Sequence, residues 1–282
     1  MLVPGSASQS LTATLAAETG RRLATPEFDR FADGELRAAV PDFDGDRAVI
    51  VAATTSNDAL VELLQLQDAV REAGAERVET VLPYVGYARQ DRAFRDGEPV
   101  SARAVGRAVA TGTDRVVLVS PHETSVADYY PVPTAVVDAA PRLADPLGEL
   151  RDPVFLAPDE GAVAVAESVR DAYGTGVVDH FRKHRDRETG EVRIDPGEVD
   201  ATGRDVVITD DIVATGSTVA EAVGALATHD PHRIVAACVH PMLAGNAHSK
   251  LAASGVDRVV GTDTVERAVS TVSVAPLLAD VV

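Results

Sequence analysis

The sequence predicts an α/β protein of two domains, each with a mainly parallel sheet flanked by helices. Short apolar runs alternate along the chain with segments that carry apolar residues at helical spacing. Three prolines, Pro141, Pro146 and Pro153, interrupt this alternation near the middle of the 282 residues. We therefore expect an N-terminal domain at 1–141 and a C-terminal domain at 142–282.

The apolar runs define the expected strands, and the segments between them define the expected helices. In the first domain we expect strands at 48–53, 78–82, 115–119 and 134–137, with helices at 58–73 and 102–110. In the second domain we expect strands at 154–157, 205–209, 233–239, 256–260 and 271–274, with helices at 161–172, 217–228 and 246–253 and a last apolar helix. Continuous apolar runs of this kind are typical of parallel strands that are covered on both faces.

The composition restricts the environment and the partners. The net charge is −18, and Lys183 and Lys250 are the only lysines. So acidic a chain argues against a nucleic-acid partner, because nucleic-acid affinity comes mainly from basic side chains. We interpret the charge as adaptation to a cytoplasm of high salt, where carboxylate repulsion is screened, and an ordinary acidic protein is the alternative. The start of the chain does not resemble a secretory leader, and no apolar run reaches the length of a membrane span. Cys238 lies in an expected apolar strand, so we expect it to be a buried core residue. A cytoplasmic protein without a membrane partner is the expectation.

Polar residues follow directly after several of the expected strands. The run at 48–53 leads to TTSN, 78–82 to PYVGYARQDR, 115–119 to SPHE, 154–157 to PDEG, and 205–209 to DDIVATGST. In open parallel sheets, ligands bind beyond the carboxyl ends of the strands. These endings predict a binding cleft without naming its chemistry.

The segment Thr209–Thr218 carries the clearest chemistry. Asp210 and Asp211 end a buried strand, and ATGST then leads into a helix. Residues 215–218 can present backbone N–H groups and hydroxyls to a phosphate at the helix N-terminus, while the acids accept hydrogen bonds from sugar hydroxyls. An ordinary capped helix start is the alternative, because Ser and Thr are common N-caps. The adjacent acids favour the phosphate site.

This segment resembles the phosphoribosyl diphosphate (PRPP) loop that phosphoribosyltransferases share with ribose-phosphate diphosphokinases. The resemblance implies that Asp210 and Asp211 bind the ribose hydroxyls and that Ala214, Thr215, Gly216, Ser217 and Thr218 surround the 5-phosphate. The family loop has an acid where this chain has Ala214. We therefore expect the backbone to hold the phosphate without a carboxylate at that position.

The segment PYVGYARQDR resembles a motif of the diphosphokinases that phosphoribosyltransferases lack. Arg89 and Arg92 offer fork-shaped donors for a polyphosphate, and Gln90 can contact a base or a phosphate. Taken alone, the segment could be a solvated basic loop. The resemblance assigns Arg89, Gln90 and Arg92 to ATP binding.

The segment FADGE is similar to the nucleotide loop of the same family. The resemblance implies that Phe31 stacks on adenine and that Asp33, Gly34 and Glu35 lie at the base and ribose of ATP. An isolated FADGE would be an ordinary polar turn.

The resemblance also implies metal and catalytic residues. His122 matches a histidine that binds Mg²⁺-ATP, and Asp159 matches a second acid on the metal side. One or two protein ligands completed by phosphate oxygens and water suit Mg²⁺. Lys183 and Arg185 match a flexible catalytic loop, whose cations would neutralise charge on the transferred group, and Arg185 would also contact ribose 5-phosphate. By composition alone, that segment would be a solvated charged loop.

Together these motifs run in family order from Phe31 to Ala247. The implied fold is two phosphoribosyltransferase-like domains, with ATP motifs in the first and the ribose 5-phosphate and catalytic loops in the second. The implied reaction transfers the diphosphoryl group of ATP to the anomeric hydroxyl of ribose 5-phosphate, giving PRPP and AMP. The family also implies a homo-oligomer with the ATP site near a subunit interface. A phosphoribosyltransferase, a non-catalytic regulatory relative and a sugar-phosphate sensor remain the alternatives.

Overall fold

The computed structural model describes residues 1–185, 192–195 and 199–282, with only the backbone described for 182–185 and 192–195. The chain divides into two compact units. Unit 1 comprises Met1–Asp138, Asp263–Glu266 and Ser273–Val282, and unit 2 comprises Ala139–Thr262 and Arg267–Val272. Both are mainly parallel sheets flanked by helices, as the sequence predicts.

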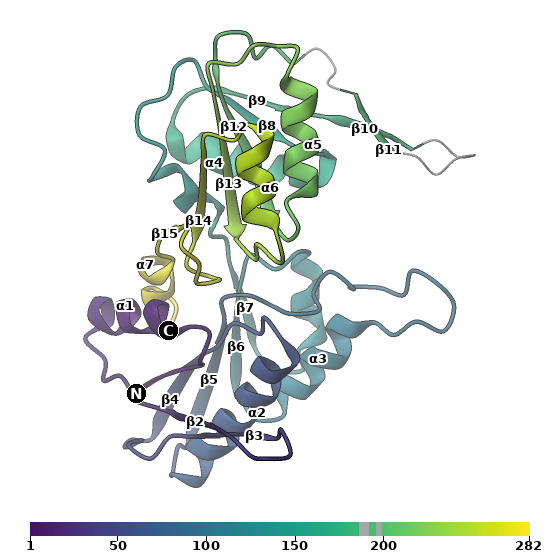
Figure 1. The fold of residues 1–282 in the computed structure, drawn as a ribbon. Coiled ribbons are helices and arrows are strands. Elements are labelled where there is room, and N and C mark those ends of the chain that lie inside the picture. Colours follow the sequence, from purple (N-terminus) through teal and green to yellow (C-terminus); the bar gives the residue numbers. More distant parts are fainter. Residues whose placement is uncertain (186–191, 196–198) are drawn as a thin grey trace. The chain divides into compact units, whose positions relative to one another are not determined.

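Unit 1 is built on a five-stranded sheet in the order β1-β4-β5-β6-β7, with every neighbouring pair parallel (Figure 1). Its strands are β1 (Leu2–Pro4), β4 (Arg47–Val51), β5 (Arg77–Leu82), β6 (Arg115–Val119) and β7 (Thr134–Val137), with a separate antiparallel hairpin of β2 (Glu27–Arg30) and β3 (Leu36–Ala39). Its helices are α1 (Gln9–Thr19), α2 (Asn57–Glu72), α3 (Ser101–Ala110), the 3-10 helix η1 (Thr124–Tyr129) and α7 (Ala275–Ala279). The sequence did not predict β1, α1, β2 or β3.

Helix α2 shows how the sequence determines a local element of unit 1. Its N-cap is Ser56, whose side chain accepts a hydrogen bond from the backbone N–H of Ala59 at 3.1 Å. Leu63, Leu66 and Val70 recur at helical spacing and are fully buried in the core that also contains the inner residues of β4, β5 and β6. This packing places the loop after β4 at the N-terminus of α2.

The last residues of the chain, Ser273–Val282, belong to unit 1. Helix α7 packs against α1, with Leu278 fully buried. Glu266 accepts hydrogen bonds from the backbone N–H groups of Ser10 (2.7 Å) and Leu11 (3.0 Å) in α1. The sequence placed all residues after 141 in the second domain, whereas the structure gives 263–266 and 273–282 to unit 1. The difference arises because the partner of α7 lies far away in the chain.

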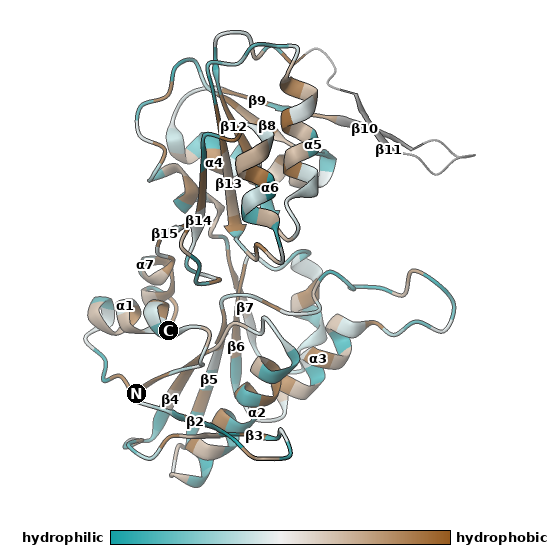
Figure 2. Ribbon diagram, viewed as in Figure 1, coloured by the Kyte–Doolittle hydropathy of each residue, from teal (hydrophilic) through white to brown (hydrophobic). Residues whose placement is uncertain are grey.

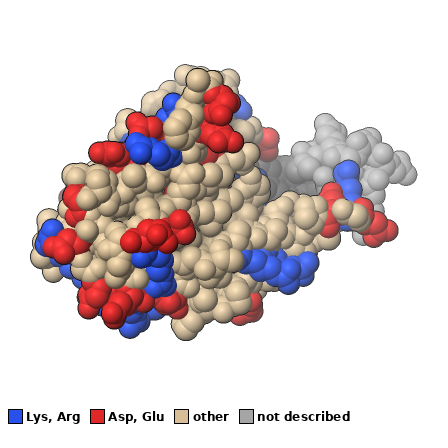
Figure 3. All heavy atoms as spheres, turned by 90° about the horizontal axis from the view of Figure 1, so that it is seen from below, with Lys and Arg blue, Asp and Glu red and all other residues tan. Residues whose placement is uncertain are grey.

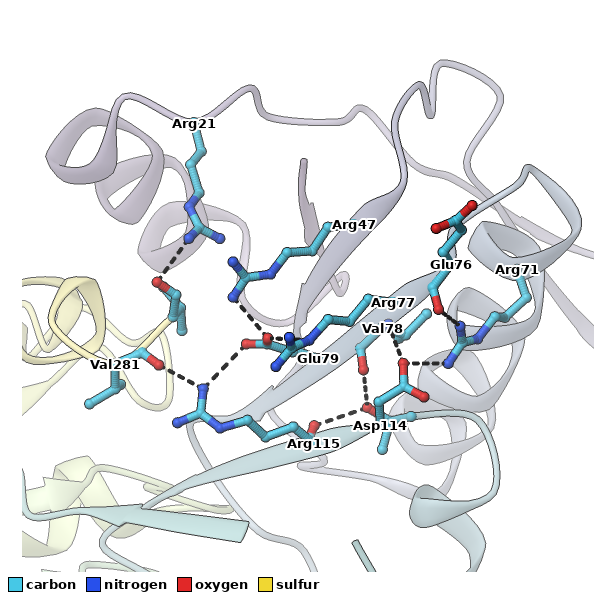
Figure 4. A network of polar contacts seen from close by, with 12 residues as sticks. Arg21, Arg47, Arg71, Glu76, Arg77, Val78, Glu79, Asp114, Arg115 and Val281 are labelled. Atoms are coloured by element: carbon cyan, nitrogen blue, oxygen red, sulfur yellow. Dashed lines mark hydrogen bonds and ion pairs between the residues drawn. The ribbon is translucent and has the colours of Figure 1, made fainter. Parts of the chain in front are cut away.

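A buried carboxylate joins the starts of three strands in unit 1 (Figure 4). Glu79 on β5 is 0% exposed. Its oxygens form ion pairs with Arg47 at 2.8 Å, Arg77 at 3.1 Å and Arg115 at 3.3 Å. Arg115 also donates to the carbonyl of Val281 at 2.7 Å. One carboxylate therefore links β4, β5 and β6 to the C-terminal residues.

Unit 2 is built on a six-stranded parallel sheet in the order β15-β14-β13-β12-β8-β9. Its strands are β8 (Val154–Ala157), β9 (Val177–His180), β12 (Asp205–Ile212), β13 (Arg233–His240), β14 (Arg258–Thr262) and β15 (Ser270–Val272). Its helices are α4 (Val163–Tyr173), α5 (Ser217–Leu226) and α6 (Ala247–Ser254), with 3-10 helices η2 (Ala140–Ala144) and η3 (Glu160–Ala162). Strand β9 was not predicted from the sequence.

Helices cover both faces of the unit 2 sheet. Leu226 of α5 and Leu251 of α6 pack on the face that carries Ile208 and Cys238, while α4 covers the opposite face (Figure 1). The central strands are strongly apolar (Figure 2). Cys238 is a buried core residue, as expected, and burial raises the pKa of its thiol. The apolar strands thus position their polar ends at one edge of the sheet.

The described surface is charged, and no described helix is long and apolar enough to cross a membrane. The face in Figure 3 shows acidic side chains beside basic ones. Some charged side chains of the protein form exposed ion pairs, such as Arg22 with Asp44 at 2.9 Å. Such exposed pairs contribute little to stability individually.

Candidate active site

The acidic pair lies at the end of strand β12, in the centre of the unit 2 sheet. The strand runs past the predicted end at Thr209 and includes both Asp210 and Asp211. Asp210 pairs in register with Cys238 of β13, which places it beside the apolar core. Each carboxylate also accepts a hydrogen bond from the next backbone amide, at 2.9 Å for Asp210 and 2.8 Å for Asp211.

At the end of β12, a negative charge on Asp210 is unfavourable when Asp211 is also charged. Burial, followed by the charge of Asp211 and a hydrogen bond with it, raises the pKa of Asp210 to about 8. The charge of Asp159, which follows β8, acts in the same direction. Sugar hydroxyls that donate to the carboxylates, or a cation beside them, would relieve this repulsion.

A second segment holds the loop that follows the acids. The backbone N–H of Val213 donates to the carbonyl of His240 at 3.2 Å. Leu243 N–H donates to the carbonyl of Val213 at 3.0 Å, and Ala244 N–H donates to the carbonyl of Ala214 at 2.8 Å. The residues after β13 therefore support the loop through its backbone. The sequence did not predict a role for this segment.

Gly216 is required where the loop enters helix α5. Its φ is +71°, a conformation that other residues rarely adopt. A Cβ at this position would lie 3.1 Å from Cγ of Leu251 on α6. As the N-cap of α5, Gly216 also provides no capping side chain. Within the described residues, the amides of 215–218 have no protein acceptor, so they remain available to an anion.

In unit 1, the loop at 83–92 is anchored to the loop after β4. The backbone N–H of Gly86 donates to Oγ1 of Thr54 at 2.7 Å. A Cβ on Gly86 would lie 2.2 Å from the carbonyl oxygen of Thr54, so only glycine fits. Arg89 and Arg92 are exposed beyond this anchor, and the guanidinium of Arg92 lies 5.3 Å from the ring centroid of Phe94. Both arginines can therefore reach a ligand in solvent.

Gln90 occupies a different position within the same loop. Its side-chain carbonyl accepts a hydrogen bond from the hydroxyl of Ser101 at the start of α3. Its backbone N–H donates to the carbonyl of Tyr87 at 3.0 Å. Gln90 is thus engaged in supporting the loop before any ligand binds.

The FADGE segment forms the turn of the β2–β3 hairpin. Phe31 N–H donates to the carbonyl of Glu35 at 2.8 Å, and Gly34 N–H donates to the carbonyl of Phe31 at 2.9 Å. The ring of Phe31 is left on the surface, with 54% of the residue exposed. The hairpin contacts α2 through an ion pair of Arg30 with Asp58. Within the described residues, no hydrogen bond or ion pair joins this turn to Arg89, Gln90 or Arg92.

The predicted metal residues follow strands in different units. His122 follows β6 and is exposed, while Asp159 follows β8 and accepts a hydrogen bond from the N–H of Gly161 at 3.1 Å. Within the described residues, no group of three or more His, Cys, Asp or Glu side chains could hold a metal ion. A Mg²⁺ ion needs only one or two protein ligands, so these single side chains fit that ion.

The predicted catalytic cations lie on a hairpin of unit 2. Lys183 and Arg185 belong to β10 (Arg182–Arg185), which pairs antiparallel with β11 (Val192–Asp195). Lys183 is in register with Ile194, and Arg185 with Val192. The side chains of both residues lie outside the described part of the structure.

Comparison with known proteins is consistent with this arrangement. Residues 1–111 match the family model for the N-terminal domain of ribose phosphate pyrophosphokinase, and residues 136–275 match the phosphoribosyl transferase domain. A ribose-phosphate pyrophosphokinase of Halobacterium salinarum is 60% identical over 282 residues, covering 99% of each chain. That of Methanosarcina mazei is 39% identical and covers 99% of this chain and 94% of the relative.

A solved structure agrees with these relatives. The phosphoribosylpyrophosphate synthetase from Mycobacterium smegmatis aligns with a TM-score of 0.84 and 30% sequence identity, covering 99% of this chain and 96% of the other. The fold and the phosphate loop define a protein of the phosphoribosyltransferase type. The chain belongs, more narrowly, to the ribose-phosphate pyrophosphokinase family, because the matches extend over both halves of the chain.

Proposed function

We infer that the chain catalyses the transfer of the diphosphoryl group of ATP to the anomeric hydroxyl of ribose 5-phosphate, giving PRPP and AMP. The observation that carries this conclusion is the presence of a supported phosphate loop and of the N-terminal diphosphokinase half in one chain. A phosphoribosyltransferase would share the phosphate loop, but the match at 1–111 favours the diphosphokinase.

Ribose 5-phosphate binds, in this proposal, at the end of β12. Asp210 and Asp211 accept hydrogen bonds from the ribose hydroxyls, and this contact favours the ionised form of Asp210. The amides of 215–218 and the hydroxyls of Thr215, Ser217 and Thr218 surround the 5-phosphate. Ala214 contributes its carbonyl to the support of the loop, because that oxygen accepts from Ala244.

ATP binding is assigned to motifs of unit 1. Arg89 and Arg92 are exposed and suited to phosphates, and Gln90 positions their loop. The exposed ring of Phe31, with Asp33, Gly34 and Glu35 in the same turn, is suited to stack on adenine. In this proposal the chain forms a homo-oligomer with the ATP site near a subunit interface, as the resemblance to the family implies.

Mg²⁺ is the proposed metal. His122 would hold the ion of Mg²⁺-ATP, and Asp159 would hold Mg²⁺ beside the acids of β12. When bound, Mg²⁺ neutralises polyphosphate charge and makes the phosphorus more electrophilic. The repulsion among Asp159, Asp210 and Asp211 supports a cation there, because a positive charge would lower the cost of ionising Asp210.

The protein contributes alignment and charge neutralisation to the reaction. The anomeric oxygen forms a bond to the β-phosphorus, the bond from that phosphorus to the α–β bridging oxygen breaks, and AMP leaves while the hydroxyl proton is lost. The acids and the phosphate loop orient the sugar, so the attacking oxygen is held in line. We propose that Lys183 and Arg185 place positive charge beside the group in transfer and that Arg185 also contacts ribose 5-phosphate.

One assay tests the function. The protein is incubated with Mg²⁺, ATP and ribose 5-phosphate in molar KCl, and AMP and PRPP are followed. Stoichiometric formation of both products is expected. In a parallel incubation with PRPP and a free base, consumption of PRPP without ATP turnover would instead indicate a phosphoribosyltransferase. No AMP above the control without ribose 5-phosphate would indicate a non-catalytic binding protein.

The net charge of −18 supports a halophilic, cytoplasmic enzyme. Screening of carboxylate repulsion by salt should raise the melting temperature between low and molar KCl. Equal melting temperatures at both salt concentrations would contradict the halophilic interpretation.

A further inference from the structure

Lys250 directs a positive charge at the phosphate loop. Its ammonium nitrogen Nζ donates to Oγ of Ser217 at 2.8 Å. Ser217 is the first residue of α5, and Lys250 lies on α6. The chain contains only one other lysine, so basic charge at this position is not part of a general lysine surface.

The hydrogen bonds at Ser217 orient its hydroxyl. Oγ of Ser217 accepts from Lys250 and also from Oγ1 of Thr215, at 3.2 Å. With its acceptor positions occupied, the Ser217 hydroxyl can donate its own proton to a further acceptor. The ammonium of Lys250 carries three protons, of which this bond uses one. Ser217 and Lys250 thus both retain donors for an anion.

The same packing that shapes the loop fixes α6, which carries Lys250. Leu251, its neighbour in sequence, lies so close to Gly216 that a Cβ there would be only 3.1 Å from Cγ of Leu251. The carbonyl of Ala247, the first residue of α6, would lie 3.4 Å from such a Cβ. The side chain of Lys250 therefore starts from a helix that lies directly against the loop. Within the described residues, no ion pair joins Lys250 to a carboxylate, so its charge is not neutralised there.

We propose that Lys250 is a positioning residue for the 5-phosphate of the sugar substrate. It holds the Ser217 hydroxyl in the orientation that donates to the phosphate, and it adds positive charge to the loop. The family loop has an acid at one position, where this chain has Ala214. The ligand group is a phosphate monoester dianion, which charge-assisted hydrogen bonds bind more strongly than neutral ones. This proposal rests on the proposed sugar-phosphate site.

The test separates sugar-phosphate affinity from folding and from turnover. Lys250→Met and Lys250→Gln remove the charge and keep most of the side-chain length, whereas Lys250→Arg keeps the charge. We expect Met and Gln to raise the Kd for ribose 5-phosphate, measured by calorimetry without ATP, by roughly 10-fold. The KM for ribose 5-phosphate should rise in parallel, while kcat and the KM for ATP change less than about twofold. The Arg variant should retain most of the affinity.

Two controls make the result specific. Arg170→Met removes a positive charge from α4, on the opposite face of the same sheet, and should leave the Kd for ribose 5-phosphate unchanged. Because Lys250 acts partly through Ser217, its loss and Ser217→Ala should be less than additive in the double variant.

An unchanged Kd in both folded Met and Gln variants, or an equal loss in the Arg variant, would overturn the proposal. If either neutral variant does not fold, the other and the Arg variant still decide. Binding calorimetry does not depend on AMP formation, so a wild type that binds ribose 5-phosphate without turnover would refute the function and leave Lys250 under test.

Discussion

Asp210 provides the sharpest test of the site's electrostatics, through the substitution Asp210→Asn. Burial and the charge of Asp211 raise the pKa of Asp210 from 3.8 to about 8. The folded protein therefore keeps a proton on Asp210 between those pH values, whereas the unfolded chain has released it. Stability due to this residue consequently falls as the pH rises from about 4 to about 8. Asn has nearly the shape of the protonated acid and is neutral throughout.

The magnitude follows from the size of the pKa change. The rise from 3.8 to about 8 corresponds to an upper value of about 6 kcal/mol, at ~1.4 kcal/mol for each tenfold change in proton affinity. Asp210→Asn should thus equal the wild type in unfolding free energy near pH 4 and exceed it by several kcal/mol near pH 8. Urea unfolding followed by circular dichroism, in molar KCl without ligands, measures the difference. Parallel pH profiles for the two proteins would refute the reasoning.

The same pKa links sugar binding to proton release. If ribose hydroxyls donate to Asp210, binding favours its ionised form, so wild-type protein at pH 7 should release up to about one proton per site. Calorimetry in two buffers of different ionisation enthalpy detects this release, and Asp210→Asn should abolish it. Proton release that persists in the Asn variant would assign the titration to another group.

Three further substitutions test the buried network, the loop glycine and the catalytic hairpin. Glu79→Gln removes the negative charge that three arginines share, and the side chains of these arginines are 26–59% exposed. We therefore expect the variant to lose about 2–3 kcal/mol of unfolding free energy. Thermal melting should show a Tm lower by roughly 5–10 °C. Equal losses in the exposed control Glu76→Gln would contradict this. Gly216→Ala should raise the KM for ribose 5-phosphate more than about 10-fold. The control Gly203→Ala lies at a similar φ of +67° but faces open space, so it should cost only about 1 kcal/mol of stability. A similar KM in both variants would argue against the close packing of Gly216 on Leu251. Lys183→Ala should lower kcat by about two orders of magnitude or more while calorimetry shows ribose 5-phosphate binding retained, and unchanged turnover would exclude the catalytic role.

Local sequence patterns predicted much of the fold and the position of a phosphate loop. Continuous apolar runs predict buried parallel strands, because a strand covered on both faces has no polar side. The pair Asp210–Asp211 before ATGST predicts a site for a phosphate and sugar hydroxyls, because the groups that meet them are adjacent in sequence. Resemblance to the family narrowed this site to a phosphoribosyl loop. The short hairpin β2–β3 escaped prediction because it lies mostly on the surface and lacks an apolar run.

Tertiary structure decided the features that depend on residues distant in sequence. Helix α7 joins unit 1 because its apolar face is buried against α1, and a short apolar segment does not specify its partner. The pKa of Asp210 depends on burial beside β13, and the role of Lys250 depends on the packing of α6 against Gly216. The sequence by itself determined which groups could bind a sugar phosphate. Only packing determined their protonation and orientation, because desolvation and distance are properties of the folded chain.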